Sequence, residues 1–415
     1  MPEATYLHFA GLKAPVLLDR AESLLPLLLN ALPKWPVEIR TITPMIPAFI
    51  SITGAENGLF EVVVNGDQSE RRKWNAVNAI CDLLAEMAWE QIRSRPDILC
   101  VHGAAVAFAG RLVLFPNSKR AGKSTLTCAL ARLGQTVFTD DFLPIAVSQD
   151  RVLSGIANGA APRLRLPIPS EFTDGFKAWA MADPGPSNRQ YKFLSNLPLS
   201  SGGVSLPLGA IVTLERQDLP TQPRLEPVER SAAMESMIVQ NFARSVHAGV
   251  ILKSIEALTA SLPCFRLVYH SGEMAAAYLH NHDLLADLPV AKLSAQVAPR
   301  LAPQDLHPAM PDPFDSAHIY AQRPHFTEIK THDAHFMADE AGLAIHRLNP
   351  GSSAIWRLLA EPVSYDEIVE VICAAFPDIQ QHQIAADTLL AMQQFVQARL
   401  IEPVVMRDPI QAVAQ

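Results

Sequence analysis

The feature that most constrains the fold is an apolar run, a loop ending in Gly-Lys-Ser-Thr and a helical run, in that order. Residues 112–115 are apolar, residues 116–125 form the loop, and residues 126–133 have a helical pattern. This order of strand, loop and helix is the context in which Gly-Lys-Ser binds phosphate. Backbone N–H groups at the helix start point at the anion, and the helix dipole favours its charge. We therefore expect an α/β nucleotide-binding core, with Lys123 on the β- and γ-phosphates and the Ser124 hydroxyl on Mg²⁺.

The loop departs from the usual pattern in its first half. Asn117 stands five residues before Gly122, where the pattern has glycine, although asparagine tolerates a left-handed backbone better than most residues. Lys119 and Arg120 occupy positions where small residues are commoner, and they either add phosphate contacts or stay solvated. The predicted nucleotide-binding residues are Asn117, Lys119, Arg120, Ala121, Gly122, Lys123, Ser124 and Thr125.

Two acidic residues, Asp140 and Asp141, follow the next apolar run, 136–139, one helix after the loop. This position puts carboxylates beside the phosphates. Phosphoryl transfer needs a phosphate cradle, a metal and an oriented nucleophile. One carboxylate would hold Mg²⁺, and the other would accept a proton from the attacking hydroxyl. The alternative is an acidic turn at the end of a strand, with no catalytic role.

The order of these motifs resembles HPr serine kinase/phosphorylase, in particular the HPr-kinase-related proteins found beside peptide-modifying systems. The resemblance covers about residues 100 to 150 and continues weakly to Arg216. It implies a P-loop kinase core that transfers phosphate from ATP to a Ser or Thr hydroxyl of a protein or peptide. It also implies that Asp140 and Asp141 supply the catalytic base and a metal contact, that Ser124 and Asp140 hold Mg²⁺, and that His102 lies near them. The motifs that carry the resemblance are His102-Gly103-Ala104-Ala105-Val106, Gly110, the loop, and Thr139-Asp140-Asp141.

The segment after the aspartate pair is less like this family. The acidic Mg²⁺-binding signature of HPr kinases is not readable there, and the chain has Arg163 and Arg165 instead. These arginines either stabilise the transferred phosphate or pair with surface carboxylates. Residues 172–205 are rich in Pro, Gly, Ser and Asn, so we expect an irregular surface loop. Its Tyr191 and Lys192 either approach the nucleotide or the acceptor, or belong to an ordinary surface.

Composition excludes several classes of function. A net charge of −8 argues against sequence-independent nucleic-acid binding, which needs a basic face. The five cysteines form no CxxC pair, so neither a zinc site nor a disulfide framework is expected, and this suits a reducing cytoplasm. The thirteen histidines show no convincing metal-ligand spacing. We find no signal peptide and no apolar run of the roughly 18 residues that a membrane span needs. A cytoplasmic protein is therefore expected.

The length of 415 residues allows two or three domains. The first part has apolar runs at 49–52 and 59–64 and a helical pattern at about 75–92, and we see no chemistry in it. In the nucleotide domain we expect strands at 104–109, 111–115, 136–139, 143–147, 209–215 and 265–269, and helices at about 231–243 and 250–261. The predicted parts are an N-terminal α+β portion (1–98), the nucleotide domain (99–285), a proline-rich linker (286–322), a C-terminal module (323–404) and a tail (405–415).

The C-terminal module has a pattern of three short strands and three helices. Strands are expected at 325–329, 334–338 and 343–348, and the last helix at 384–399. Asn349 would cap the first helix. Ser364 would cap the second, with Glu367 at capping-box spacing. The pattern predicts a winged-helix-like domain.

This module resembles PqqD, the peptide-chaperone family also called the precursor-peptide recognition element. The resemblance implies that the module binds a leader peptide as an added strand against its sheet, beside its last helix. A DNA-reading winged helix is the structural rival, but residues 384–397 contain no basic residue. The motifs that carry the resemblance are LNPGSSAIWRLL (348–359), SYDEIV (364–369) and FVQARLI (395–401).

Together the two resemblances predict a kinase that phosphorylates a Ser or Thr of a ribosomally made precursor peptide held by residues 323–404. ATP and Mg²⁺ are the expected cofactors, and the leader peptide is the expected partner; an oligomer is possible. One alternative is a nucleotide-binding peptide chaperone that transfers no phosphate. The other is a kinase for a small molecule.

Overall fold

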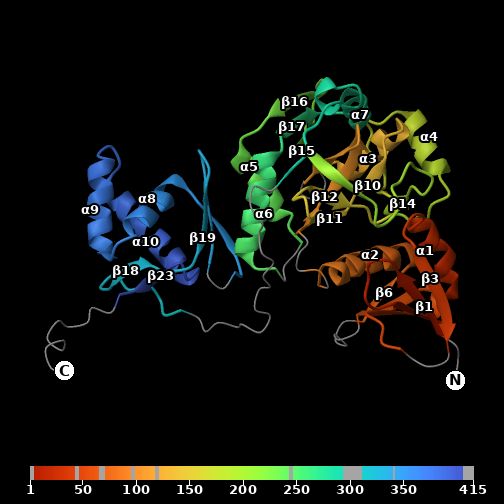
Figure 1. Cartoon of the computed structure of the whole chain (residues 1–415), viewed down its shortest axis with the longest axis horizontal. Helices are drawn as coiled ribbons and strands as arrows, with labels where there is room; N and C mark the ends of the chain where they lie inside the picture. The colour runs from red at the N-terminus through yellow and green to blue at the C-terminus, as the bar shows by residue number, and fades with distance from the viewer. Residues whose placement is uncertain are drawn as a thin grey trace. The chain divides into compact units, whose positions relative to one another are not determined.

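The computed structural model describes residues 4–42, 46–64, 71–93, 95, 99–116, 121–242, 246–292, 311–339 and 342–404 (Figure 1). The chain divides into two compact units, residues 1–245 with 254–300 and residues 246–253 with 301–415. Both α-helices and β-strands occur in each unit, so the fold is mixed α/β. Among the helices in these ranges, none combines the length and the apolar character that a membrane span needs.

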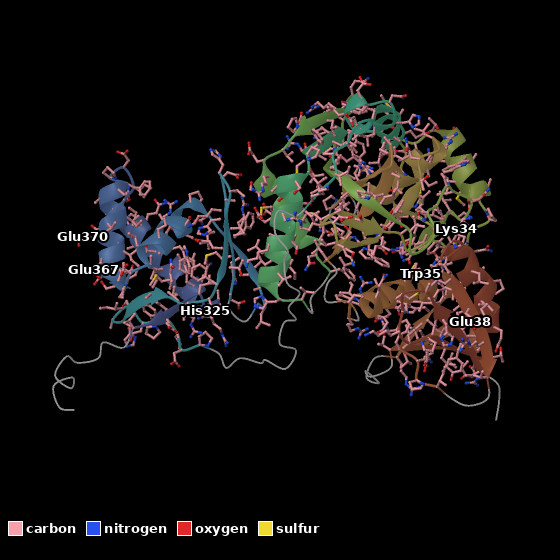
Figure 2. The ribbon with its side chains drawn as sticks, in the orientation of Figure 1. Lys34, Trp35, Glu38, His325, Glu367 and Glu370 are labelled. Atoms are coloured by element: carbon pink, nitrogen blue, oxygen red, sulfur yellow. The ribbon has the colours of Figure 1, made fainter. Side chains whose placement is uncertain are left out.

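The first unit begins with a six-stranded sheet of order β3-β1-β2-β4-β5-β6. Helix α2 has eight buried residues, and the strand expectations at 49–52 and 59–64 and the helix expectation at 75–92 are confirmed by β4, β5 and α2. Trp35, labelled in Figure 2, follows α1 and donates its indole N–H to the Ala10 carbonyl over 3.0 Å. The elements are β1 (Ala4–Phe9), β2 (Val16–Asp19), α1 (Leu25–Ala31), β3 (Val37–Ile42), β4 (Ile50–Gly54), β5 (Phe60–Val64), β6 (Arg72–Trp74) and α2 (Ala76–Arg93).

A nine-stranded sheet forms the centre of the first unit. Its order is β10-β8-β9-β15-β12-β11-β7, with β17 pairing β15 and β16 pairing β17. Strands β9, β15 and β17 run parallel, and the other pairs are antiparallel. The strands are β7 (Leu99–His102), β8 (Ala104–Phe108), β9 (Arg111–Phe115), β10 (Val137–Thr139), β11 (Phe142–Val147), β12 (Leu153–Ile156), β15 (Ser205–Arg216), β16 (Arg224–Pro227) and β17 (Cys264–Tyr269). All six strand expectations for this domain are confirmed.

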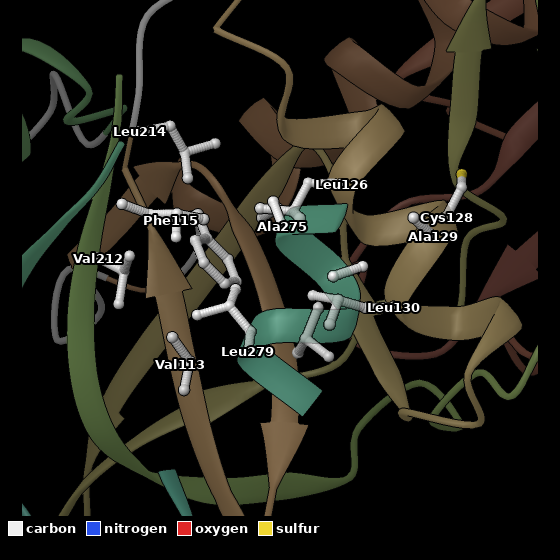
Figure 3. Close-up of a cluster of buried hydrophobic side chains, with 14 of the residues drawn as sticks. Val113, Phe115, Leu126, Cys128, Ala129, Leu130, Val212, Leu214, Ala275 and Leu279 are labelled. Atoms are coloured by element: carbon white, nitrogen blue, oxygen red, sulfur yellow. The ribbon is translucent and has the colours of Figure 1, made fainter. Parts of the chain in front are cut away.

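Helices α3 (Lys123–Arg132) and α7 (Gly272–His280) pack on this sheet. Figure 3 shows their shared core, in which apolar side chains of both helices meet those of β9 and β15. Because β9 and α3 are adjacent in the chain and share this core, the start of α3 is held at the carboxyl end of β9. The labelled core residues include Val113, Phe115, Leu126, Leu130, Val212, Leu214, Ala275 and Leu279.

One expectation for the rest of this unit is wrong, and one expected helix is shorter than predicted. Residues 172–205 are not wholly irregular, since they contain α4 (Asp174–Ala182) and β14 (Tyr191–Phe193), which pairs β13 (Arg163–Arg165). Thr173 caps α4 by accepting a hydrogen bond from the Phe176 N–H; the turn residues around this short helix hid its pattern. Helix α5 (Arg230–Val239) ends four residues before the expected end, whereas α6 (Ala248–Ser261) lies where a helix was expected.

The second unit contains two three-stranded sheets, β19-β20-β21 and β22-β18-β23. The three expected strands and three expected helices are present, and Asn349 and Ser364 cap α8 and α9 as predicted, with the Glu367 capping box complete. Glu367 and Glu370, labelled in Figure 2, lie on α9. The elements are β18 (Ile319–Gln322), β19 (Thr327–Lys330), β20 (His335–Ala338), β21 (Ile345–Leu348), α8 (Pro350–Leu358), β22 (Val363–Ser364), α9 (Tyr365–Ala375), α10 (Gln381–Gln397) and β23 (Ile401–Pro403).

Strand β18 lies inside the segment 286–322 that was expected to be linker. It pairs with both β22 and β23, and the Tyr320 side chain is 2% exposed in the core around Trp356. Its partners β22 and β23 have two and three residues and lie far along the chain. No local sequence pattern therefore predicts this sheet. Residues 293–310 of this segment lie outside the described residues.

Candidate active site

The start of α3 is half-buried at Ser124 and Thr125, and the rest of the helix packs into the core. Gly122 precedes the helix with φ of 91°, and as a glycine it has no side chain that could cap the helix N-terminus. The Tyr269 hydroxyl donates to the Ala121 carbonyl over 3.0 Å, and a Cβ added at Gly122 would lie 2.3 Å from that hydroxyl oxygen. Only glycine therefore fits this turn. Lys123 is 7% exposed. Asn117, Lys119 and Arg120 lie outside the described residues.

A buried threonine shapes the turn that carries the acidic pair. Thr139 ends β10, and its hydroxyl accepts hydrogen bonds from the backbone N–H groups of Asp141 and Phe142 over 3.1 and 3.3 Å. The Asn158 amide donates to the same hydroxyl oxygen over 3.2 Å. Thr139 and Asn158 are 2% and 3% exposed, so the turn between β10 and β11 is rigidly held.

Asp140 faces the start of α3. Its Oδ2 accepts the Arg163 backbone N–H over 3.0 Å, and its carboxyl is hydrogen-bonded to the Ser124 hydroxyl. Burial, followed by the charge of Asp141, raises the pKa of Asp140 to about 6, against the opposing effects of Arg163 and Ser124. A carboxyl so placed gains from a cation beside it, because a positive charge would offset the cost of its ionisation.

Asp141 has two basic side chains beside it, those of His102 and Arg163. Its Oδ1 lies 3.3 Å from Nδ1 of His102, and its Oδ2 lies 3.6 Å from Nη2 of Arg163. The Gly103 N–H donates to the Asp141 carbonyl over 2.9 Å, which ties the turn to the end of β7. His102 and Arg163 come from different elements, so they fix the carboxylate from two sides.

These residues line one cleft of about 460 Å³. The predicted residues Ala121, Gly122, Lys123, Ser124, Thr125, Asp140, Asp141 and His102 all border it. The remaining lining residues are Arg163, Arg165, Leu166, Pro167, Pro169, Tyr191 and Arg216. The cleft thus brings together every predicted site residue in the described part of the chain.

The part of the cleft formed by β13 and β14 combines cations with an aromatic ring. The guanidinium carbons of Arg163 and Arg165 lie 5.0 and 5.8 Å from the centre of the Tyr191 ring. Arg216 Nη1 lies 3.2 Å from Glu171 Oε1. Cations at a cleft that also holds a helix N-terminus favour a ligand with several negative charges. Lys192 takes no part, because its buried ammonium donates to the carbonyls of Asp183 and Gly185.

Sequence patterns missed two residues of this site, Tyr269 and Asn158, and gave no partner for Thr139 or Arg163. Tyr269 and Thr139 hold the two turns, Asn158 supports Thr139, and Arg163 contacts both aspartates. Arg163 was noted, but its pairing with Asp141 depends on β13 reaching the cleft. A tyrosine at the end of an apolar run and a threonine just before Asp-Asp were the available signals, and neither indicates a partner by itself.

The donors of the cleft are compatible with Mg²⁺ held mainly by a nucleotide. Within the described residues, no group of three or more His, Cys, Asp and Glu side chains could hold a metal ion alone. Ser124 and Asp140 offer one hydroxyl and one carboxylate, which are hydrogen-bonded to each other. Mg²⁺ commonly takes one or two carboxylates and completes its shell with phosphate and water oxygens.

The second unit has a different candidate site. In the sheet β19-β20-β21, the strand β21 pairs with β20 on one side, with Met337 opposite His346. No other strand pairs with β21 in the described ranges, so its second edge offers backbone hydrogen-bonding groups. Helix α10 shares the core of this unit with Trp356, which is 1% exposed.

Comparison with protein families finds a match to part of this unit. The model of the family described as Coenzyme PQQ synthesis protein D (PqqD) matches residues 334–401. Residues 334–401 form a PqqD domain. The match confirms the predicted resemblance of the C-terminal module, and it covers α8, α9 and α10 with β20 and β21.

Solved structures that match include two of relevance. TbiB1 in complex with the TbiA(beta) leader peptide matches with 20% identity, 20% coverage of this chain, 98% coverage of that chain and a TM-score of 0.19. The Hpr(Ser) kinase/phosphatase from Coxiella burnetii matches with 13% identity, 45% coverage of this chain, 96% coverage of that chain and a TM-score of 0.23. At these TM-scores neither structure constrains the fold or the function of this chain. No curated protein matches the chain.

Proposed function

We propose that the chain is an ATP- and Mg²⁺-dependent kinase that phosphorylates a Ser or Thr of a ribosomally made precursor peptide captured by its PqqD domain. The observation that carries the proposal is that the start of α3 and the pair Asp140 and Asp141 border one cleft. The order of these motifs, which resembles HPr-kinase-related proteins, supports phosphoryl transfer as the reaction.

In this proposal the start of α3 is a P-loop and holds the phosphates. Backbone N–H groups after Gly122 donate to them, and Lys123 reaches the β- and γ-phosphates. Ser124 and Asp140 would hold Mg²⁺, which supplies neutralisation of the phosphate charge. The desolvated carboxyl of Asp140 suits this role, because a nearby cation would favour its ionised form. Arg165 lines the same cleft and would stabilise the transferred group.

Asp141 would act as the catalytic base. The acceptor hydroxyl oxygen forms a bond to the γ-phosphorus, the bond from that phosphorus to the bridging oxygen of ADP breaks, and the hydroxyl proton goes to Asp141. His102 and Arg163, at 3.3 and 3.6 Å, would hold the carboxylate toward the hydroxyl.

The PqqD domain would supply the substrate. A leader peptide would add as a strand at the β21 edge, beside α10, and side-chain pockets would select its sequence. We propose a winged-helix-like arrangement for this domain. A tethered leader presents the rest of the precursor to the cleft at up to millimolar effective concentration. In this proposal the chain consists of an N-terminal portion (1–98), a nucleotide domain (99–285), a linker, a peptide-binding module that ends at residue 404, and a tail (405–415).

A nucleotide-binding peptide chaperone without transfer is the second candidate. It is favoured by the departure of the loop at Asn117 and by the small set of metal donors among the described residues. Both candidates bind nucleotide, so only the transfer of phosphate separates them.

The experiment compares Lys123→Ala with Lys13→Ala, an exposed lysine outside the cleft. We expect Lys123→Ala to abolish phosphate transfer and to weaken ATP binding measured by calorimetry, because the cation aimed at the phosphates is lost. Lys13→Ala should match the parent. Equal transfer by the parent and Lys123→Ala would remove the assignment of the loop.

A further inference from the structure

One face of helix α2, in the N-terminal portion, contacts residues that support the cleft. Cys81 and Trp89 follow Asn78 by three and eleven residues. At about 100° per residue, the three side chains leave the helix within an arc of about 80°. All three side chains are half-buried. Each contacts a residue that in turn contacts the site.

The first contact joins α2 to the aromatic part of the cleft. The Asn188 side-chain amide donates to Oδ1 of Asn78 over 2.9 Å and to Oδ1 of Asn75, just before the helix, over 3.1 Å. The Asn188 side-chain oxygen accepts the Tyr191 N–H over 2.8 Å. Asn188 thereby links α2 to the ring on which Arg163 stacks.

The second contact reaches an arginine of the site directly. The Cys81 sulfur is hydrogen-bonded to the Arg163 guanidinium. That guanidinium also lies 3.6 Å from Asp141 and 5.0 Å from the centre of the Tyr191 ring. Arg163 is thus held from three directions, one of them α2.

The third contact supports the histidine. The Trp89 and Phe242 rings stack with centroids 4.4 Å apart at 27°, and the Phe242 and His102 rings lie 6.5 Å apart at 20°. The Phe242 N–H donates to the Cys100 carbonyl over 2.7 Å, which fixes Phe242 beside β7. The His102 ring is therefore the last of three stacked rings, and the first of them, Trp89, lies on α2.

We propose that α2 positions both side-chain partners of Asp141, with Trp89 acting on His102 through Phe242, and Cys81 and Asn78 acting on Arg163. The N-terminal portion then helps to hold the active-site residues in place. This inference rests on the proposed kinase function, and Trp89, Cys81 and Asn78 are positioning residues, since none borders the cleft.

The test uses the full chain with ATP, Mg²⁺ and a precursor peptide, and compares Trp89→Ala with Trp89→Phe. A misplaced base lowers the rate of the chemical step more than substrate binding, so we expect Trp89→Ala to lower kcat about tenfold with the KM for ATP changed less than about twofold. Trp89→Phe, which keeps a stacking ring, should recover kcat to within about threefold of the parent. Cys81→Ser should resemble the parent more than Cys81→Val, because serine keeps a hydrogen-bond acceptor for Arg163.

Two further measurements separate this inference from a loss of fold and from failure of the proposed function. Trp74→Ala, on β6, removes an indole N–H that donates to Asp82 of α2 over 2.9 Å but makes none of the three contacts above, so it is the control for loss of a tryptophan that touches the same helix. The imidazole NMR signals of His102, assigned with His102→Gln, should shift in Trp89→Ala and not in Trp74→Ala. If the parent chain transfers no phosphate, the proposed kinase function is refuted. The His102 signals alone then test whether Trp89 positions His102. Unchanged kcat and unchanged His102 signals in Trp89→Ala would overturn the positioning role.

Discussion

Replacing Asp140 by asparagine should stabilise the chain in the absence of ligands. The pKa of Asp140 is raised from the ordinary 3.8 to about 6, mainly by burial. Between these values the folded chain keeps a proton that the unfolded chain loses, so the free energy of unfolding falls as pH rises through this range and stays lower above it. A shift of about 2 units, at 1.36 kcal/mol each, costs about 3 kcal/mol at pH 7. This is an upper bound, because Asp140 keeps part of its surface in solvent.

Asparagine has nearly the shape of aspartate and no charge, so it removes this cost. We expect Asp140→Asn to raise the free energy of unfolding by up to about 3 kcal/mol at pH 7.5, and by less than about 1 kcal/mol at pH 4, where the folded parent is protonated. The assay is urea unfolding of the parent and variant at both pH values. Asp150→Asn makes the same chemical change at an exposed position and is the control.

Ligands should reverse the ranking. If Asp140 helps to hold Mg²⁺, then Mg²⁺ with ATP stabilises the parent through binding and stabilises Asp140→Asn less. An Asp140→Asn variant that is less stable than the parent at pH 7.5 without ligands, or equally stabilised at both pH values, would refute the reasoning. Either result would mean that the carboxylate is well solvated or well paired in the folded chain.

Two other predictions follow from the same geometry. Gly122→Ala should destabilise the first unit by about 1–3 kcal/mol, because φ of 91° and the Tyr269 hydroxyl both exclude a Cβ; thermal unfolding of Gly122→Ala equal to that of the parent would contradict this. Residues 311–404 should fold alone more stably than residues 323–404, because only the longer fragment contains β18; circular dichroism during urea unfolding compares them, and equal midpoints would make β18 dispensable.

The sequence indicated those parts of the site that are consecutive in the chain. The run from β9 to Lys123 and the pair Asp140 and Asp141 could be found because each is a local pattern. The caps Asn349 and Ser364 were equally local, since each bonds a backbone N–H three residues ahead. What these patterns have in common is that the partner atoms lie within one turn of the chain.

The parts that could not be predicted depend on contacts between distant segments. Arg163 meets Cys81 and Asp141 only because the fold brings β13 beside both α2 and the turn after β10, across 82 and 22 positions of sequence. Tyr269 holds the Ala121 carbonyl from 148 residues away. No periodicity in the sequence encodes such pairs. The contacts of α2 with the site therefore could not be predicted, and the sequence of the N-terminal portion indicated no chemistry.

The measurement that tests the central claim most directly is the mass of a candidate precursor peptide after incubation with the full chain, ATP and Mg²⁺. The candidate is a short peptide encoded beside the gene, with a Ser or Thr after its leader. We predict that the peptide gains one phosphoryl group, located on a Ser or Thr, that ADP forms in equal amount, and that Lys123→Ala produces neither. A peptide that binds the chain but keeps its mass, while ATP stays intact, would contradict the kinase and leave the chaperone.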